Sequence, residues 1–419
     1  MIFRFKCIVI FILFILYHKL YEIANRYIIK RKILSKEDIY YEEKFPNISE
    51  AFNKSKIFLY KCLKGILISN KTYNISGDPK ISAIINFYNS QKTISRAIKS
   101  IQNQNISDIE IIMINDFSSD NSLSIVENIK KNDSRIKIIN NKKNMGTLFS
   151  RSIGALYSKG KYIFHLDSDD MFLDEDVFSV TTEIAEKGNF DIVSFRSIRS
   201  CYGGNILTNQ IKENPLNYHI NNKVLFQNEL SLYPVRTGRY LGKYIIKENF
   251  MWSKCFKTKV YQTTLNIVGI ERYSRYMTYE EDRAILYALF NVAESLKFIG
   301  KYGILQIWTQ GSMTKRRRNY LHQLRCFLYF ADIVIALNKE SKRSRKLLVY
   351  IITFLINIFS KRNDELNKFN EYDRKLFISC LNRILNDKYI SNKDKKEIRK
   401  RVSTLKAKSD IFNISFHIF

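Results

Sequence analysis

The chain has 419 residues, of which 45% are hydrophobic and 14% aromatic; this composition excludes an intrinsically disordered chain and leaves room for one large domain and a smaller one. Its 6 cysteines form no C-x-x-C pair, which argues against a zinc module and against a dense disulfide framework. The formal net charge of +29 predicts attraction to anionic surfaces or ligands and carries no information about the fold.

An apolar run occupies residues 7–17, with basic residues on both sides of it. A helix over this run would rise about 17 Å, which is short of the ~30 Å hydrocarbon core of a membrane. Residues 2–6 extend the run until it nearly spans, and no small-x-small cleavage site follows. The pattern favours a membrane anchor over residues 1–24 rather than a signal peptide or a buried core helix, followed by a stem or linker over residues 25–78.

Strand and helix patterns alternate from residue 81 to residue 166. Apolar strands are expected at 81–87, 109–115, 135–140 and 162–166, and helices with apolar periodicity at 93–104, 121–132 and 146–159. Because these strands are apolar throughout, both of their faces are expected to be buried. The alternation predicts an α/β fold with a mainly parallel central sheet.

Polar residues follow the predicted strands. Ligands bind beyond the carboxyl ends of the strands in such a sheet, and this edge is expected to bring together Tyr88, Asn89, Asp116, Asn144, Asp167, Asp169 and Asp170. Neither a G-x-G-x-x-G motif nor a P-loop follows the first strand, which excludes a dinucleotide or Walker-type site at this turn.

Three aspartates, Asp167, Asp169 and Asp170, crowd the end of the last of these strands. Carboxylates this close repel one another, and a hard cation such as Mg²⁺ or Mn²⁺ would relieve that repulsion and complete its shell with substrate phosphates. The alternative is a solvated turn with an aspartate capping the next helix. Asp116, expected at a neighbouring strand end, favours the metal.

Four segments, in order, resemble the nucleotide-binding half of family 2 glycosyltransferases with the GT-A fold. They are SAIINFYN (82–89), EIIMINDFSSDNS (110–122), NMGTLFSRSIG (144–154) and GKYIFHLDSDD (160–170). The resemblance implies metal-dependent, inverting transfer of a sugar from a nucleotide-sugar donor to a glycan, lipid or protein acceptor. The Q-x-x-R-W motif of processive members is absent, which favours a single addition.

The resemblance also implies roles for individual residues. Tyr88 would stack on the nucleobase, Asp116 would bond the base edge, and Arg151 would face the diphosphate. Asp167 and Asp169 would form the D-x-D motif, with Asp169 as the principal metal contact. The remaining donor-binding candidates are Asn86, Asn89 and Asn144. Three positions depart from the family pattern, at Asn86, Asn115 and Ser152, and Asn86 in place of the usual proline puts the identity of the nucleotide in doubt.

A general base is expected in the second half of such an enzyme. The segment YEEDRAILYALF (279–290) places Glu281 and Asp282 before apolar residues at helical spacing. In the family an E-D pair at this distance from the D-x-D motif provides the base, preceded by a W-x-K segment that here is MWSKCFK (251–257). We expect Asp282 to be the base, with Glu281 as the nearest alternative. The other interpretation is an acidic first turn that complements the helix dipole.

The chain changes character after residue 312. Residues 313–419 contain 25 Lys+Arg against 10 Asp+Glu, with apolar runs at 327–337 and 347–359. These runs are too short to span a membrane, so core helices or membrane-surface helices are expected. We therefore predict a glycosyltransferase domain over 79–312 and a basic, mostly helical region over 313–419.

Two other functions stay open on the sequence alone. One is a non-catalytic GT-A-like protein that binds nucleotide at a membrane surface, and the other is a protein that binds a membrane surface or nucleic acid through its charge. Nucleic acid is not expected as a partner, because the aromatic residues lie in apolar runs instead of being interleaved with basic patches.

The topology of the anchor is ambiguous. Basic residues after the apolar run outnumber those before it, which favours a cytosolic body. The order of anchor, stem and transferase domain resembles Golgi-type enzymes with a lumenal body. We expect a single-pass protein of the Golgi or another secretory-pathway membrane, attached through its N-terminal helix and with its body in the lumen.

Overall fold

The computed structural model describes residues 77–200, 211–213, 224–226, 251–307, 320–337, 342–361 and 368–406. The expected anchor over 1–24 and nearly all of the expected stem over 25–78 lie outside these residues. Among the helices that are described, none is both long and apolar enough to cross a membrane.

The first half of the central sheet is parallel. Its strands are β1 (Ile81–Phe87), β2 (Ile109–Asn115), β3 (Ile136–Asn140) and β4 (Tyr162–Asp167), arranged in the order β3-β2-β1-β4. The helices α4 (Ile94–Gln102), α5 (Ser122–Lys130) and α6 (Thr147–Tyr157) alternate with them. Six of the seven residues of β1 and all seven of β2 are buried, which is why these strands are apolar throughout. The α/β fold and these elements are confirmed.

The second half makes the sheet mixed. Here β9 (Lys254–Lys257) pairs antiparallel with both β4 and β6 (Ile192–Ser200). Strand β10 (Ser295–Ile307) is parallel to β6 and antiparallel to β5 (Met171–Phe172). Two further short strands, β7 (Ile211–Glu213) and β8 (Val224–Phe226), pair antiparallel with β6 and β10. The predicted parallel pairing therefore describes the first four strands.

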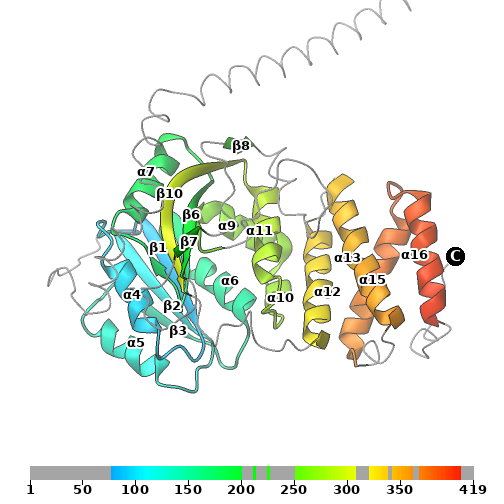
Figure 1. Cartoon of the computed structure of the whole chain (residues 1–419), viewed down its shortest axis with the longest axis horizontal. Helices are drawn as coiled ribbons and strands as arrows, with labels where there is room; N and C mark the ends of the chain where they lie inside the picture. Colours follow the sequence, from blue (N-terminus) through cyan, green and yellow to red (C-terminus); the bar gives the residue numbers. More distant parts are fainter. Residues whose placement is uncertain are drawn as a thin grey trace, which may run out of the picture.

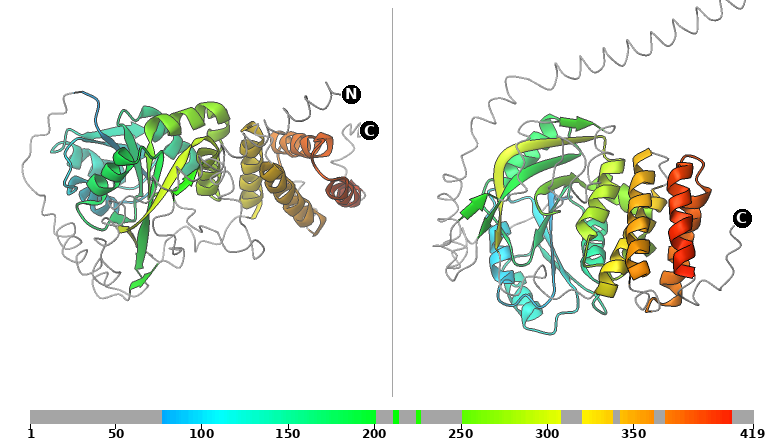
Figure 2. Two further views of the ribbon diagram at one scale, coloured as in Figure 1. Left: turned by 90° about the horizontal axis from the view of Figure 1, so that it is seen from above. Right: turned by 45° about the vertical axis from the view of Figure 1, so that its right-hand side comes forward.

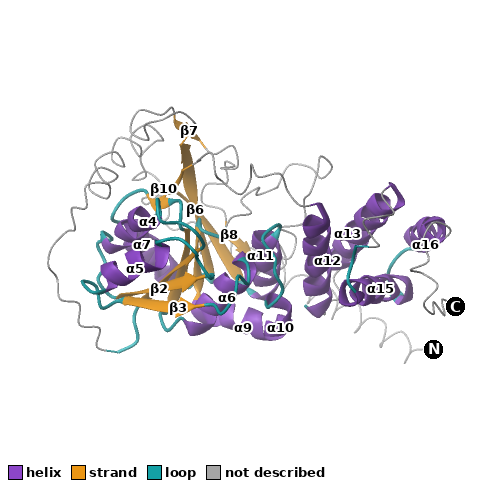
Figure 3. Ribbon diagram, turned by 90° about the horizontal axis from the view of Figure 1, so that it is seen from below, coloured by secondary structure: helices purple, strands orange, loops and turns teal. Residues whose placement is uncertain are grey.

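Helices cover both faces of the sheet, as Figure 3 shows. Alternate strand residues separate into two cores: Ile84 and Ile112 lie in the core shared with α6, α9 (Thr258–Val268) and α11 (Glu281–Val292), whereas Ile85 and Ile111 lie in the core shared with α4, α5 and α7 (Val177–Lys187). A Cβ at Gly154 would come within 2.6 Å of Ile84 Cγ2, so this glycine lets α6 approach β1 closely.

The C-terminal part of the chain forms a row of helices beyond α11 (Figures 1 and 2). The row consists of α12 (Tyr320–Ala336), α13 (Lys342–Lys361), α15 (Glu371–Asn386) and α16 (Asn392–Lys406). The short helix α10 (Ile270–Tyr273) precedes α11 in the chain. Side chains from the two apolar runs, such as Ile333 and Ile352, are buried in the same core cluster as Ile84 of β1. The expected helical character is confirmed for the described residues, and the two runs contribute core residues.

Candidate active site

Neighbouring strand ends bring the predicted site residues to one edge of the sheet. Phe87, the last residue of β1, pairs with Asn115, the last residue of β2, and Asn86 pairs with Asp167 at the end of β4. Tyr88 and Asp116 each follow directly on their strands. Parallel pairing in register therefore places three chain segments side by side, although they are far apart in sequence.

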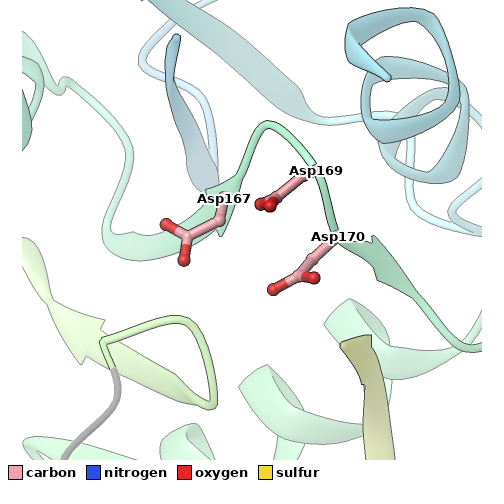
Figure 4. Close-up of side chains that lie close together, drawn as sticks. All are labelled: Asp167, Asp169 and Asp170. Atoms are coloured by element: carbon pink, nitrogen blue, oxygen red, sulfur yellow. The ribbon is translucent and has the colours of Figure 1, made fainter. Parts of the chain in front are cut away.

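The turn between β4 and β5 carries the three aspartates. Asp167, Asp169 and Asp170 can each offer a carboxylate oxygen such that the three atoms lie within 4.8 Å of one another, and Figure 4 shows the three side chains gathered at this turn. Asp170, which lies outside the D-x-D motif, is buried, and its Oδ1 accepts a hydrogen bond of 2.8 Å from the Ile307 amide. Arg96 donates to the Asp169 carbonyl oxygen at 2.5 Å, which fixes the turn.

The electrostatics of this turn suit a cation. Burial, followed by the charge of Asp167, raises the pKa of Asp169 to about 6. Burial, followed by the neighbouring carboxylates Asp169 and Asp167, raises the pKa of Asp170 well above its usual range. Crowded, partly desolvated carboxylate oxygens form the donor set that Mg²⁺ and Mn²⁺ prefer. The residues of the turn therefore fit a hard divalent cation.

Asp116 holds the segment that leads into α6. Its Oδ1 accepts from the Met145 amide at 2.7 Å and from Asn141 Nδ2 at 2.8 Å, and its Oδ2 accepts from the Gly146 amide at 2.9 Å. Asp116 was expected to bond a base edge, and these contacts within the protein were not predicted. A carboxylate oxygen has two lone pairs, so Oδ2 retains capacity for one more donor, and base recognition stays a prediction.

The other predicted donor-binding residues lie around the same edge. Tyr88 is 47% exposed, as a stacking face requires. Asn89 has a positive φ of 49° and accepts from the Ser119 amide at 2.8 Å, so its side chain fixes the β1 turn to the β2 turn. The side-chain oxygens of Asn86 and Asn144 are buried and have no hydrogen-bond partner among the described residues. Each can therefore accept a hydrogen bond from a ligand or from water.

Arg151 joins the two acidic parts of the site. Its side chain is 3% exposed; Nη2 lies 2.7 Å from Asp167 Oδ1, and Nη1 forms an ion pair with Asp282 and lies 3.7 Å from Glu281 Oε1. Burial lowers the pKa of Arg151, but the charges of Asp282, Asp167 and Glu281 raise it by more than burial lowers it. The net pKa is above its usual value, so the guanidinium stays charged. The expected contact with a diphosphate stays a prediction, because in this structure the guanidinium contacts carboxylates.

Glu281 and Asp282 lie in the first turn of α11, after Glu280 with a left-handed φ of 61°. Burial, and then the charge of Asp282, raise the pKa of Glu281 to about 8. Burial also raises the pKa of Asp282, to about 6, although Arg151 and Lys254 oppose the rise. Both carboxylates lie in the acidic first turn and also face Arg151, so their contacts go beyond those of a solvated first turn.

Two exposed aromatic residues near this edge were not predicted. Tyr276 is 48% exposed and packs against the turn before α6, where a Cβ at Gly146 would lie 3.2 Å from Tyr276 Cδ2. Phe117, directly after Asp116, is 57% exposed and has a φ of 66°. No periodicity marks either residue; the only signal for Phe117 was its place at a strand end.

Residues 82–242 match the model of the family described as "Glycosyl transferase family 2". This segment belongs to glycosyl transferase family 2. The matched segment includes Asp116, Arg151 and the turn that carries Asp167, Asp169 and Asp170 (the aspartate turn). Glu281 and Asp282 lie beyond the matched segment. Arg151 is thus the direct link between the matched segment and the E-D pair.

Curated relatives carry the family 2 likeness over part of their length. An uncharacterized glycosyltransferase of Haemophilus influenzae is 35% identical over 159 residues, which cover 36% of this chain and 49% of the relative. The cholesterol galactosyltransferase of Borreliella burgdorferi is 29% identical over 239 residues, which cover 56% of this chain and 62% of the relative. The chain therefore spans less than two thirds of the length of either relative.

A crystal structure of S. aureus TarS in complex with UDP-GlcNAc is similar at 15% identity and a TM-score of 0.49, with 80% of this chain and 89% of the TarS chain covered.

Proposed function

We propose that the protein is a glycosyltransferase that moves a sugar from a nucleotide-sugar donor to an acceptor hydroxyl, with inversion at the anomeric carbon. One observation carries the proposal: Arg151 holds Asp167 of the aspartate turn and Asp282 of the E-D pair at the same edge of the sheet. A diphosphate site and a candidate base are thereby close enough to act on one substrate.

Asp167, Asp169 and Asp170 would hold Mg²⁺ or Mn²⁺. When bound there, such an ion supplies positive charge against the donor diphosphate and the leaving nucleoside diphosphate. The protein residues contribute geometry: Arg96 fixes the backbone of the turn, and the Ile307 amide fixes the Asp170 carboxylate. Positioned side chains of this kind need no rearrangement during the reaction.

The nucleotide would lie against Tyr88, whose exposed ring can stack on a base. The unpartnered oxygens of Asn86 and Asn144 can accept from base or ribose donors. Tyr276 adds a second aromatic side chain beside the turn that Asp116 holds. These four side chains and the remaining acceptor capacity of Asp116 form the proposed nucleoside site.

Asp282 is the proposed general base. Burial raises the pKa of both carboxylates, and the Arg151 guanidinium, which pairs directly with Asp282, opposes the rise there and favours the ionised form of Asp282. In the transfer step the acceptor oxygen gives its proton to Asp282 and forms a bond to the anomeric carbon. The bond from that carbon to the diphosphate breaks, and the electron pair leaves with the nucleoside diphosphate.

A lipid or a lipid-linked glycan is favoured as the acceptor over a free glycan or a protein. Several relatives are named for lipid or lipid-linked acceptors: the cholesterol galactosyltransferase of Borreliella burgdorferi, a processive diacylglycerol beta-glycosyltransferase of Mycoplasma pneumoniae, and a GalNAc(5)-diNAcBac-PP-undecaprenol beta-1,3-glucosyltransferase of Campylobacter jejuni. Membrane attachment through residues 1–24 would bring the site to such an acceptor. Membrane fractionation of the protein with and without residues 1–24 tests the attachment. The comparison of acceptors described next tests the lipid specificity.

The test is donor screening by nucleotide release with Mn²⁺ or Mg²⁺, repeated with lipid, glycan and peptide acceptors. We expect one nucleotide-sugar to be cleaved, faster with a lipid hydroxyl acceptor, and the Asp282→Asn variant to bind the same nucleotide without transfer. A protein that binds nucleotide but releases none of it from any donor would instead support the non-catalytic alternative.

A further inference from the structure

The short loop before the E-D pair contains a residue in an unfavourable backbone conformation. Residues 274–280 connect α10 to α11, and the last of them, Glu280, has a φ of 61° although it is not glycine. Such a backbone conformation costs free energy and persists where surrounding contacts hold it. Glu281 and Asp282 follow directly, so whatever holds this loop also sets the direction of the two carboxylates.

One side of the loop contacts α6 and the turn before it. The Leu148 amide, in the first turn of α6, donates to the Met277 carbonyl oxygen at 3.2 Å. Tyr276 packs on Gly146 in the turn before the same helix. The helix that carries Arg151 therefore also contacts the loop that leads to Asp282.

The other side of the loop rests on α12. Asp332 is 7% exposed, and its Oδ2 lies 2.7 Å from Arg275 Nη1 in the loop and 3.2 Å from Arg272 Nε just before it. The Arg275 guanidinium also lies over the ring of Tyr329, 5.2 Å from its centroid. A buried carboxylate of α12 thus fixes the start of the loop.

Further contacts follow toward the N-terminus of α12. His322 Nε2 lies 2.9 Å from Thr278 Oγ1, and its ring centroid lies 5.2 Å from that of Tyr276. Phe327 meets the Tyr279 ring edge-on at 5.8 Å. Because His322, Cys326, Tyr329 and Asp332 recur at helical spacing, these contacts belong to one face of α12. The loop is therefore held between α6 and α12.

We infer that the C-terminal helical region is part of the catalytic unit, and that Asp332 and His322 are positioning residues that orient Glu281 and Asp282 through residues 274–280. The inference rests on the proposed function, since it assigns the region a task in the same reaction. Asp332 acts through Arg275, and His322 acts through Thr278. A displacement of about 1 Å at a reacting group can lower the rate by about 10²-fold.

The chain offers a matched control for Asp332. Asp373 of α15 is also a buried aspartate, with Oδ2 2.7 Å from Arg325 Nε and Oδ1 accepting from Tyr329 Oη at 2.9 Å. These two partners, Arg325 and Tyr329, belong to α12 and not to residues 274–280. Asp332→Asn and Asp373→Asn each remove one buried charge from the same group of helices, but only the first removes a contact with the loop.

The experiment measures turnover, donor affinity, melting temperature and amide hydrogen exchange of residues 274–284 for the full chain and both variants. We expect both variants to melt at a lower temperature, and Asp332→Asn alone to lose about 10²-fold in kcat with donor affinity within about twofold of wild type. Exchange of the Ala284 amide, which bonds the Glu280 carbonyl oxygen, should rise in that variant. Asp332→Glu should recover part of the lost kcat.

Thr278→Val keeps the argument testable if Asp332→Asn does not fold, because it removes the hydrogen bond to His322 without leaving a buried charge. It should raise exchange in residues 274–284 and lower kcat without changing donor affinity. Equal kcat and equal loop exchange in Asp332→Asn and Asp373→Asn would overturn the inference. If the wild type itself transfers no sugar, the proposed function fails, and the exchange measurements still decide whether α12 holds the loop.

Discussion

The two acidic clusters of the site are neutralised in different ways. In the aspartate turn, Asp169 and Asp170 lie beside further carboxylates, and the pKa of each is raised. In the E-D pair, the same kinds of side chain face Arg151, a cation that the protein itself supplies. Among the described ion pairs, Arg151 also reaches Asp167 of the turn but not Asp169 or Asp170, so the proposed external cation would neutralise those two carboxylates. This difference favours the turn as the proposed metal site and the pair as the proposed base.

The largest expected effect comes from Asp282→Asn. Loss of a general base lowers kcat by about 10²–10⁴-fold. Nucleotide affinity should stay near that of the wild type, because the proposed nucleoside contacts come from other residues. Single-turnover transfer and nucleotide titration measure the two quantities. Weakened nucleotide binding would place Asp282 in the donor site, and a dead Glu281→Gln variant beside an active Asp282→Asn variant would move the base to Glu281.

The aspartate turn should respond next. Asp169→Asn is expected to lower kcat by about 10²–10³-fold, the size of effect seen when one element that stabilises transition-state charge is lost. Chelation by EDTA should produce the same loss, with Mn²⁺ or Mg²⁺ restoring more activity than Ca²⁺, whose coordination shell is larger and looser. Asp169→Asn retaining more than about a tenth of wild-type turnover would show that the turn does not serve a metal.

Substitutions at Arg151 test whether its charge sets the pKa of Asp282. With Asp282 as the base, kcat/KM should rise with pH through a pKa of about 6 and then level off, because the carboxylate acts in its ionised form. Arg151 lowers the pKa of Asp282, so Arg151→Gln should move this limb to higher pH. Arg151→Lys, which keeps the charge, is the control and should move the limb less. A limb that stays in place would mean that another group titrates in the pH–rate profile.

The sequence predicted the parallel half of the sheet best, because its strands and turns follow from local pattern. The expected strands at 81–87 and 109–115 have the same bounds as β1 and β2, and the aspartate turn follows β4 as predicted. Polar residues after buried parallel strands must share an edge, so the motif order carried the geometry.

The second half shows what a linear pattern leaves out. Arg151 and Asp282 are 131 residues apart in sequence, and their contact depends on how α6 packs on α11. Strand β9 has only four residues and follows no alternation that would distinguish it from a turn. Asp116 looked free to meet a base, but Asn141 and the amides of the next turn bind it first, and Asp332 gave no signal because its partners come from another part of the chain.

The smallest expected effect concerns the exposed aromatic side chain that the sequence did not reveal. If Tyr276 belongs to the nucleoside site, Tyr276→Ala should weaken donor binding by about 0.5–1.5 kcal/mol, or up to about tenfold, through loss of an aromatic contact. Tyr276→Phe should bind nearly as well as wild type, because the ring and not the hydroxyl makes the contact. Tyr157 is the matched control: it is 64% exposed and ends α6, at the opposite end from Gly146. Titration with the nucleoside diphosphate separates the two sites. Equal affinities of Tyr276→Ala and Tyr157→Ala would confine Tyr276 to supporting the loop before the E-D pair, and the donor would then be bound from the parallel half of the sheet.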